Sequence, residues 1–201
     1  GTVQCAAAAY DWMLELLGLA GNFAEAERLA RSVPDGAEGV LFSPYLMAQR
    51  TPHWDADTVG ALYGFTLRHN RAHIVRAVYE GVAFALGDVF DCMAESGRAP
   101  GRVTLIGGGA KSALWSEILC NVWNVPLQAH GEPGAATSLG AAFAAGIGAG
   151  IWESFAQTRE TVRYAEMLEP SAERAARYRM LHDKYDLIYP TLKPLYKQTK
   201  G

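Results

Sequence analysis

The residues best suited to bind a ligand form a run of three glycines between a predicted strand, residues 102–106, and a predicted helix, residues 114–122. Glycine has no Cβ, so such a backbone can approach a flat or charged ligand closely. The first N–H groups of the following helix can also point at an anion. The run reads Gly107-Gly108-Gly109-Ala110-Lys111-Ser112. A tight strand-to-helix turn without a ligand is the alternative interpretation.

The glycine run matches neither of two familiar nucleotide patterns. The phosphate loop GxxxxGK(S/T) requires glycine where Ala110 and Leu105 stand, and the dinucleotide pattern GxGxxG requires glycine at Ser112. The run therefore predicts a close approach to a ligand without specifying which one.

A second group of chemically capable side chains lies in residues 49–57, which have no helical or strand periodicity. Arg50, His53, Asp55 and Asp57 bring together a guanidinium, an imidazole and two carboxylates. Such a mixture can bind a polyol or line a cleft, because loops often carry binding residues. A solvated loop is the alternative.

Other reactive side chains are better explained by structure than by chemistry. His69 and His73 are four residues apart and can face one metal on a helix. No cysteine or third histidine stands at ligand spacing, so capping or surface histidines are favoured. Glu80 and Asp88 fall in an apolar helix, where a carboxylate needs a partner or an altered pKa. We expect Glu80 to hydrogen-bond the backbone or a loop.

The elements that must position these residues alternate between strand and helix. This alternation indicates an α/β fold with an at least partly parallel sheet. Helices are predicted over residues 4–17, 22–33, 73–96, 114–122, 136–147, 153–161 and 171–189, the last followed by a short basic tail. Strands are predicted over residues 40–46, 59–66, 102–106 and 126–129, with an edge strand over 162–168.

Composition excludes several classes of protein. The chain has 201 residues and a net charge of −3, so nothing favours nucleic acid or an anionic membrane as a partner. Residues 134–152 carry no charge over 19 positions, but their one apolar stripe among small residues favours packing within a protein over a membrane span. Three scattered cysteines indicate reduced thiols and a cytoplasmic protein. The first residues lack an initiator Met, so we expect the chain to begin inside a longer protein.

Three segments together resemble a known family. Residues 60–65 (GALYGF) and 73–84 (HIVRAVYEGVAF) are similar to the second signature of the FGGY carbohydrate kinases. Residues 104–112 (TLIGGGAKS) with Trp115 are similar to the adenosine motif of that family. The resemblance is strongest to members that act on D-xylulose, through residues 44–46 (PYL) and 50–53 (RTPH).

The resemblance implies a two-domain kinase of the actin/hexokinase-like class, a ribonuclease H-like fold with a mixed sheet flanked by helices. ATP and a sugar would meet between the domains, with Mg²⁺ in the full-length parent. The chain, residues 1–201, would be the C-terminal nucleotide-binding domain. Its partners would be the N-terminal domain and the sugar, with a homodimer as a further expectation. The N-terminal domain would hold the phosphate motif, most sugar contacts and the aspartate that accepts the sugar proton.

The resemblance also assigns site residues. Glu80 and Gly81 would serve packing, and the resemblance supplies no catalytic and no metal-binding residue within this chain. The alternatives are a kinase for gluconate, glycerol or ribulose, a nucleotide- or sugar-sensing module, and a dehydrogenase domain. The mismatch to GxGxxG counts against the dehydrogenase domain. Gly107, Gly108, Gly109, Ala110 and Lys111 would contact the nucleotide, and Ala7, Ala8 and Asp11 would lie near its terminal phosphates.

Overall fold

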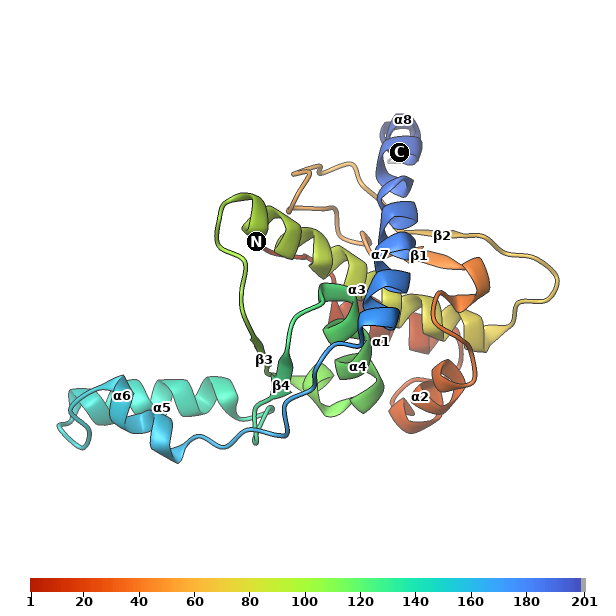
Figure 1. Ribbon diagram of the computed structural model, residues 1–201. Helices are drawn as coiled ribbons and strands as arrows, with labels where there is room; N and C mark the ends of the chain where they lie inside the picture. Colours follow the sequence, from red (N-terminus) through yellow and green to blue (C-terminus); the bar gives the residue numbers. More distant parts are fainter. Residues whose placement is uncertain (200–201) are drawn as a thin grey trace.

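The structure, a computed structural model, describes residues 1–199 and is built around one long helix, α3 (Arg71–Glu95). Its inward-facing side chains, such as Val75, Val78 and Val82, are buried, because the helix is covered on most sides. The helix begins at Asn70, whose side chain accepts a hydrogen bond from the Ala72 N–H. Around it pack α1 (Ala7–Leu16), α2 (Phe23–Arg31), α4 (Ala113–Trp123) and α7 (Ala172–Asp186) (Figure 1).

Side-chain caps fix where most of these helices begin. Asn22 accepts a hydrogen bond from the Glu25 N–H, and Ser171 accepts one from the Arg174 N–H. Asparagine and serine are favoured at this position because their side-chain oxygens accept N–H groups of the first helical turn. The predicted helices over 4–17, 22–33, 73–96 and 114–122 are therefore confirmed, with ends that differ by a few residues.

The strands are shorter than predicted and form two small sheets. β1 (Leu41–Ser43) and β2 (Ala61–Tyr63) are antiparallel, with Phe42 opposite Leu62. β3 (Val103–Leu105) and β4 (Leu127–Ala129) are parallel, with Thr104 opposite Gln128. This pair confirms the predicted parallel element, and its carboxyl end leads directly into the glycine run.

Two predicted elements at the C-terminal end are wrong in detail. Residues 162–168 form no continuous edge strand: Tyr164 and Leu168 make single antiparallel bridges to His130 and Leu127. The predicted tail after residue 189 belongs to a helix, α8 (Ile188–Thr199), even though Pro194 lies inside it. Apolar residues at positions 188, 192 and 196 recur every four residues and anchor this helix, since the first and last are buried.

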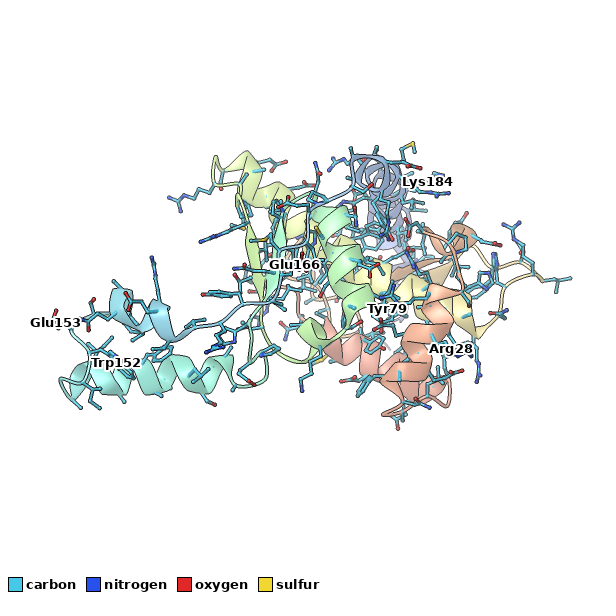
Figure 2. The ribbon with its side chains drawn as sticks, turned by 60° about the horizontal axis from the view of Figure 1, so that its bottom comes forward. Arg28, Tyr79, Trp152, Glu153, Glu166 and Lys184 are labelled. Carbon is cyan, nitrogen blue, oxygen red and sulfur yellow. The ribbon has the colours of Figure 1, made fainter. Side chains whose placement is uncertain are left out.

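An arm projects from this body. α5 (Ala136–Gly148) extends away from the other helices, with α6 (Phe155–Thr158) beside it (Figure 1). The Phe143 ring packs edge-on against Trp152, with 5.5 Å between the centroids. Figure 2 shows Trp152 and Glu153 at the far tip of the arm and Tyr79 inside the body. Across the described residues, no helix is both long and apolar enough to cross a membrane.

Short 3₁₀ helices complete the chain in three connections. They are η1 (Ala37–Gly39), η2 (Gly108–Lys111) and η3 (Arg159–Thr161). Of these, η2 carries most of the predicted glycine site, so its surroundings decide what that site can hold.

Candidate functional site

The glycine run forms an open turn at the end of β3. Gly107 has φ of 81° and ψ of −171°, a conformation that only glycine adopts without strain. Its N–H donates a 2.7 Å hydrogen bond to the carbonyl of Pro133, which ties the turn to the segment before α5. A Cβ added at Gly107 or Gly108 would meet no heavy atom within 4 Å. The turn therefore faces open space, which a ligand can occupy.

An aromatic cluster supports the turn from below. A Cβ at Gly109 would lie 3.5 Å from the Trp115 ring, so this glycine rests on the indole. The Trp115 ring in turn contacts the rings of Tyr10 and Tyr79, with both pairs of centroids 5.3 Å apart. The two tyrosine hydroxyls hydrogen-bond each other at 2.7 Å. Packing thus joins the turn rigidly to α1 and α3.

The N-terminus of α4 already holds an anion, and that anion is Glu27 of α2. Its carboxylate accepts hydrogen bonds from the Ser112 hydroxyl (2.7 Å) and the Leu114 N–H (3.2 Å). Ser112 also accepts the Trp115 N–H at 3.1 Å. Burial alone would raise the pKa of Glu27, but the hydrogen bonds from Ser112 and Arg31 hold it below its ordinary value. A protein carboxylate therefore already accepts the Leu114 N–H, one of the first N–H groups of α4 that could otherwise point at a ligand anion.

The remaining turn residues differ in accessibility. Ala110 is buried, so only its backbone can face a ligand. Lys111 is exposed, and its Nζ lies 3.9 Å from the Cβ position of Gly134, in the turn that precedes α5. Two glycine-containing turns therefore lie side by side. Sequence reasoning treats the second one only as a connection, although its glycine-rich composition before a helix is the signal that could have drawn attention to it.

The predicted residues on α1 lie on its exposed side. Ala7, Ala8 and Asp11 are exposed, whereas Tyr10 and Met13 on the opposite side are buried. No side chain caps this helix, and its first turn carries no acidic residue. The start of α1 thus differs from that of α4, and Tyr10 connects it to Trp115 beneath the glycine turn.

The polar loop of residues 49–57 packs against α8. The Asp55 carboxylate accepts a 2.8 Å hydrogen bond from the Tyr189 hydroxyl, and the His53 ring stacks on the same tyrosine at 3.6 Å. A hydrogen bond from the Asp57 N–H and the one from Tyr189 lower the pKa of Asp55. The loop is therefore ordered, and no contact in the described structure brings Arg50, His53, Asp55 or Asp57 to the glycine turn.

The two histidines near the start of α3 act as caps. The ring Nδ1 of His73 accepts the Asn70 N–H at 3.2 Å, and that of His69 accepts the Thr66 N–H at 2.8 Å. Neither belongs to the three-residue group of metal-ligand side chains found within residues 1–199. The capping interpretation is confirmed.

Glu80 is structural, as expected. It is 1% exposed and accepts hydrogen bonds from Arg76 (2.7 Å), the Gly36 N–H (2.9 Å) and the Tyr178 hydroxyl (3.0 Å). These partners come from α3 itself, from the loop after α2 and from α7. The neighbouring Gly81 packs so closely on β1 that an added Cβ would be 2.0 Å from the Phe42 carbonyl oxygen.

Comparison with known proteins identifies the class of protein that carries this fold and turn. The profile of the FGGY family of carbohydrate kinases, C-terminal domain, matches residues 1–149. The chain belongs to this family. The relatives confirm the predicted fold class, an actin/hexokinase-like α/β domain.

Individual relatives include kinases for more than one substrate. The chain is 34% identical to the xylulose kinase of Bacillus subtilis over 97% of its own length and 39% of that protein. A solved xylulose kinase from Lactobacillus acidophilus, with bound ligand, superposes with a TM-score of 0.86 at 26% identity, covering 98% of this chain and 40% of that one. A glycerol kinase from Plasmodium falciparum, solved with ADP, gives 0.77 at 25% identity, covering 92% and 37%. The chain thus spans about two fifths of the length of these relatives.

Proposed function

We propose that this chain is the C-terminal, nucleotide-binding domain of a two-domain sugar kinase. The observation that carries the proposal is the open turn Gly107–Lys111, which is held from below by Trp115 and from the side by Glu27. A flat group can lie against Gly107 and Gly108, because no side chain or backbone atom fills the space in front of them. Membership of the carbohydrate kinase family makes adenosine the group that fits this description.

In this proposal, the nucleotide phosphates lie at the start of α1 and not at the start of α4. Since Glu27 occupies the start of α4, a phosphate there would meet a like charge. The start of α1 carries no acidic residue in its first turn, so we place Ala7 and Ala8 near the terminal phosphates. Asp11, one turn further along, is placed there by the family resemblance alone. Adenosine would lie on Gly107, Gly108, Gly109, Ala110 and Lys111.

The parent enzyme would transfer the γ-phosphate of ATP to D-xylulose, giving ADP and D-xylulose 5-phosphate. Phosphoryl transfer depends on in-line positioning and on stabilisation of charge around the γ-phosphate. The residues of this chain would bind and orient the nucleotide, whereas the N-terminal domain would supply the group that accepts the sugar proton. In the parent, Mg²⁺ would bind with the nucleotide phosphates and neutralise part of their charge.

The sugar is the finer part of the proposal. Residues 44–46 and 50–53 resemble those of xylulose kinases, and the Bacillus subtilis relative has that name. Glycerol, gluconate and ribulose are the competing substrates, because a glycerol kinase also superposes well. We further propose that the parent is cytoplasmic, because the described residues contain three free cysteines. That the parent forms a homodimer is a separate proposal.

Calorimetric titration with ADP and Mg²⁺ tests nucleotide binding by the chain itself. We expect weak binding by the wild type and none by Gly108→Asp, since the new carboxylate would fill the open space beside the ligand. Gly101→Asp is the matched control, because a Cβ at Gly101 also meets nothing within 4 Å. Equal binding by both variants would place the nucleotide elsewhere.

Activity tests the parent reaction. The chain alone should release no ADP with D-xylulose, ribulose, glycerol or gluconate in a coupled assay. Adding the N-terminal half should restore activity with D-xylulose. Activity restored with another sugar would support the kinase proposal but refute D-xylulose as the substrate. Sugar-dependent ADP release by the chain alone would refute the proposal that the N-terminal domain is needed for the reaction.

A further inference from the structure

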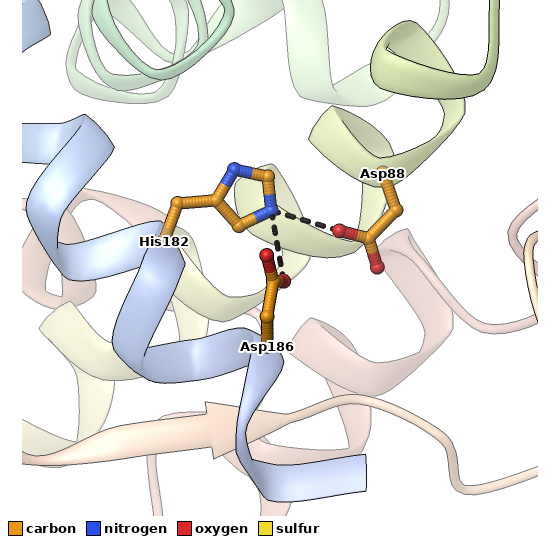
Figure 3. A group of neighbouring side chains, drawn as sticks. All are labelled: Asp88, His182 and Asp186. Atoms are coloured by element: carbon orange, nitrogen blue, oxygen red, sulfur yellow. Dashed lines mark hydrogen bonds and ion pairs between the residues drawn. The ribbon is translucent and has the colours of Figure 1, made fainter. Parts of the chain in front are cut away.

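A histidine and two aspartates meet where α3 packs beside α7, and the proposed nucleotide site uses none of them. The Nε2 atom of His182 lies 2.8 Å from an Oδ1 of Asp88 and 3.5 Å from an Oδ1 of Asp186 (Figure 3). His182 and Asp186 are four residues apart on α7, so both side chains leave the same face of the helix. One candidate ligand atom from each residue lies within 4.8 Å of the other two.

These separations fit a shared metal ion. Zinc binds histidine nitrogen and carboxylate oxygen at about 2.0–2.2 Å, so two ligands of one ion lie roughly 3.0–3.5 Å apart. The two distances from Nε2 are close to this range. Both carboxylates also face the same ring nitrogen, and their candidate oxygens lie within 4.8 Å of each other, so a small rotation of the exposed Asp186 side chain would let both bind an ion that replaced the ring proton.

Packing holds the histidine ring in place. His182 is 3% exposed, and its ring stacks on Phe84 with the centroids 5.2 Å apart. Gly87 lies against the ring edge, where an added Cβ would be 2.8 Å from Cε1. A ring fixed in this way is already oriented before any ligand binds, which favours affinity.

Two cavities beside the cluster give a cation access and room for water. One, of about 480 Å³, is lined in part by His182, and the other, of about 410 Å³, is lined in part by Asp88 and Asp186. The second cavity is lined by the carboxylates of Asp88, Asp91, Glu95 and Asp186, against one guanidinium. This excess of negative charge attracts a cation independently of the ligand distances, and water molecules in the cavity would complete its coordination.

We propose that Asp88, His182 and Asp186 bind a divalent transition-metal ion, for which Zn²⁺ is the probe. One imidazole with two carboxylates suits Zn²⁺ better than Mg²⁺, which prefers oxygen ligands alone. The ion would clamp α7 onto α3 and stabilise the folded chain by mass action. The proposal does not depend on the kinase reaction, because it concerns only this chain and its folding.

Calorimetric titration of the 201-residue chain with Zn²⁺ tests the site. We expect one saturable site in the wild type and binding weaker by about tenfold or more in Asp186→Asn. Asp186 is chosen because its side chain is 49% exposed, so the variant should fold. Asp183→Asn is the control: it removes the same charge from an exposed position of the same helix and should bind like the wild type.

Thermal unfolding gives an independent reading. At the same Zn²⁺ concentration, the melting temperature should rise equally in the wild type and in Asp183→Asn, and less in Asp186→Asn. Absence of a saturable site in the wild type, equal affinities of the two variants, or equal affinity for Mg²⁺ and Zn²⁺ would each overturn the proposal. Loss of binding in His53→Gln instead would place the ion elsewhere in the cavity and overturn it as well.

Discussion

Two glycine-containing motifs of this chain have opposite surroundings. Gly81 in α3 lies against the backbone of β1, with no room for even a methyl group, and its neighbour Glu80 is fully paired inside the body. Gly107 and Gly108 in the turn after β3 face open space. The first motif therefore needs glycine for packing, and the second needs it for what lies outside the protein.

This difference separates stability from binding. A substitution in the Glu80–Gly81 segment should destabilise the folded chain, whereas one in the glycine turn should leave stability intact and change ligand affinity. A substitution of Glu27 should affect both stability and ligand affinity, because Glu27 belongs to α2 and hydrogen-bonds Ser112 and Leu114 beside the turn. The following variants test the contrast, from the largest expected effect to the smallest.

Glu80→Gln should have the largest effect. It removes one of the two carboxylates that pair with Arg76, which is 3% exposed; the other, Asp35, remains. Breaking a buried pair by changing one partner costs about 3–5 kcal/mol, and urea denaturation followed by circular dichroism would measure the loss. Glu25→Gln, which removes the half-buried partner of the exposed Arg28, should change stability little. Equal midpoints for the two variants would show that the buried network does not hold the body together.

Gly81→Ala should cost about 3 kcal/mol, the upper end for overpacking, because its Cβ would collide with a backbone oxygen that cannot rotate away. The same denaturation experiment measures it. Gly101→Ala is the control at an open position. If Gly81→Ala were as stable as wild type, the packing role of this motif would be refuted.

Glu27→Gln should have the smallest effect on stability, about 1 kcal/mol, since one charge-assisted contact at the start of α4 weakens. Its ADP affinity should fall more than that of Glu25→Gln, because the changed residue contacts Ser112 and Leu114 beside the turn. Titration calorimetry on both variants measures this. Identical affinities would mean that Glu27 does not position the turn.

The same carboxylate makes a prediction about pH. Its pKa in the folded chain is lower than the ordinary value of 4.5, so the folded state binds fewer protons than the unfolded state. Its contribution to stability is therefore complete above that ordinary value and is lost as the pH falls through the lowered folded pKa. Glu27→Gln should remove this part of the acid dependence; an unchanged difference between wild type and variant from pH 6 to pH 3 would contradict it.

Much of the fold follows from local signals in the sequence. Capping residues such as Asn22 and Ser171, together with apolar periodicity, predict the helices of the body. The predicted strands are longer than the observed ones, because the apolar runs continue beyond the three residues that pair in each strand. α8 is missed because its prolines weaken the helical pattern, while the contacts that hold it come from distant residues.

The candidate site is predictable only where it is local. The glycine turn lies in one continuous segment, and the family resemblance draws attention to it. Glu27 could not be found this way, since it is 85 residues from Ser112 and reaches it only through folding. The same is true of Asp88 and His182, which are 94 residues apart. Neither spacing nor periodicity carries information about such pairs.

The indole beneath the glycine turn also has an optical consequence. Trp115 is buried, it supports Gly109, and two tyrosine rings lie within 5.3 Å of it. Light absorbed by Tyr10 or Tyr79 is therefore transferred efficiently to this tryptophan, whose emission depends on the polarity and rigidity of the turn above it. Trp115 is one of five tryptophans, so once the other four are replaced by phenylalanine, its emission can report occupancy of the turn without an attached dye.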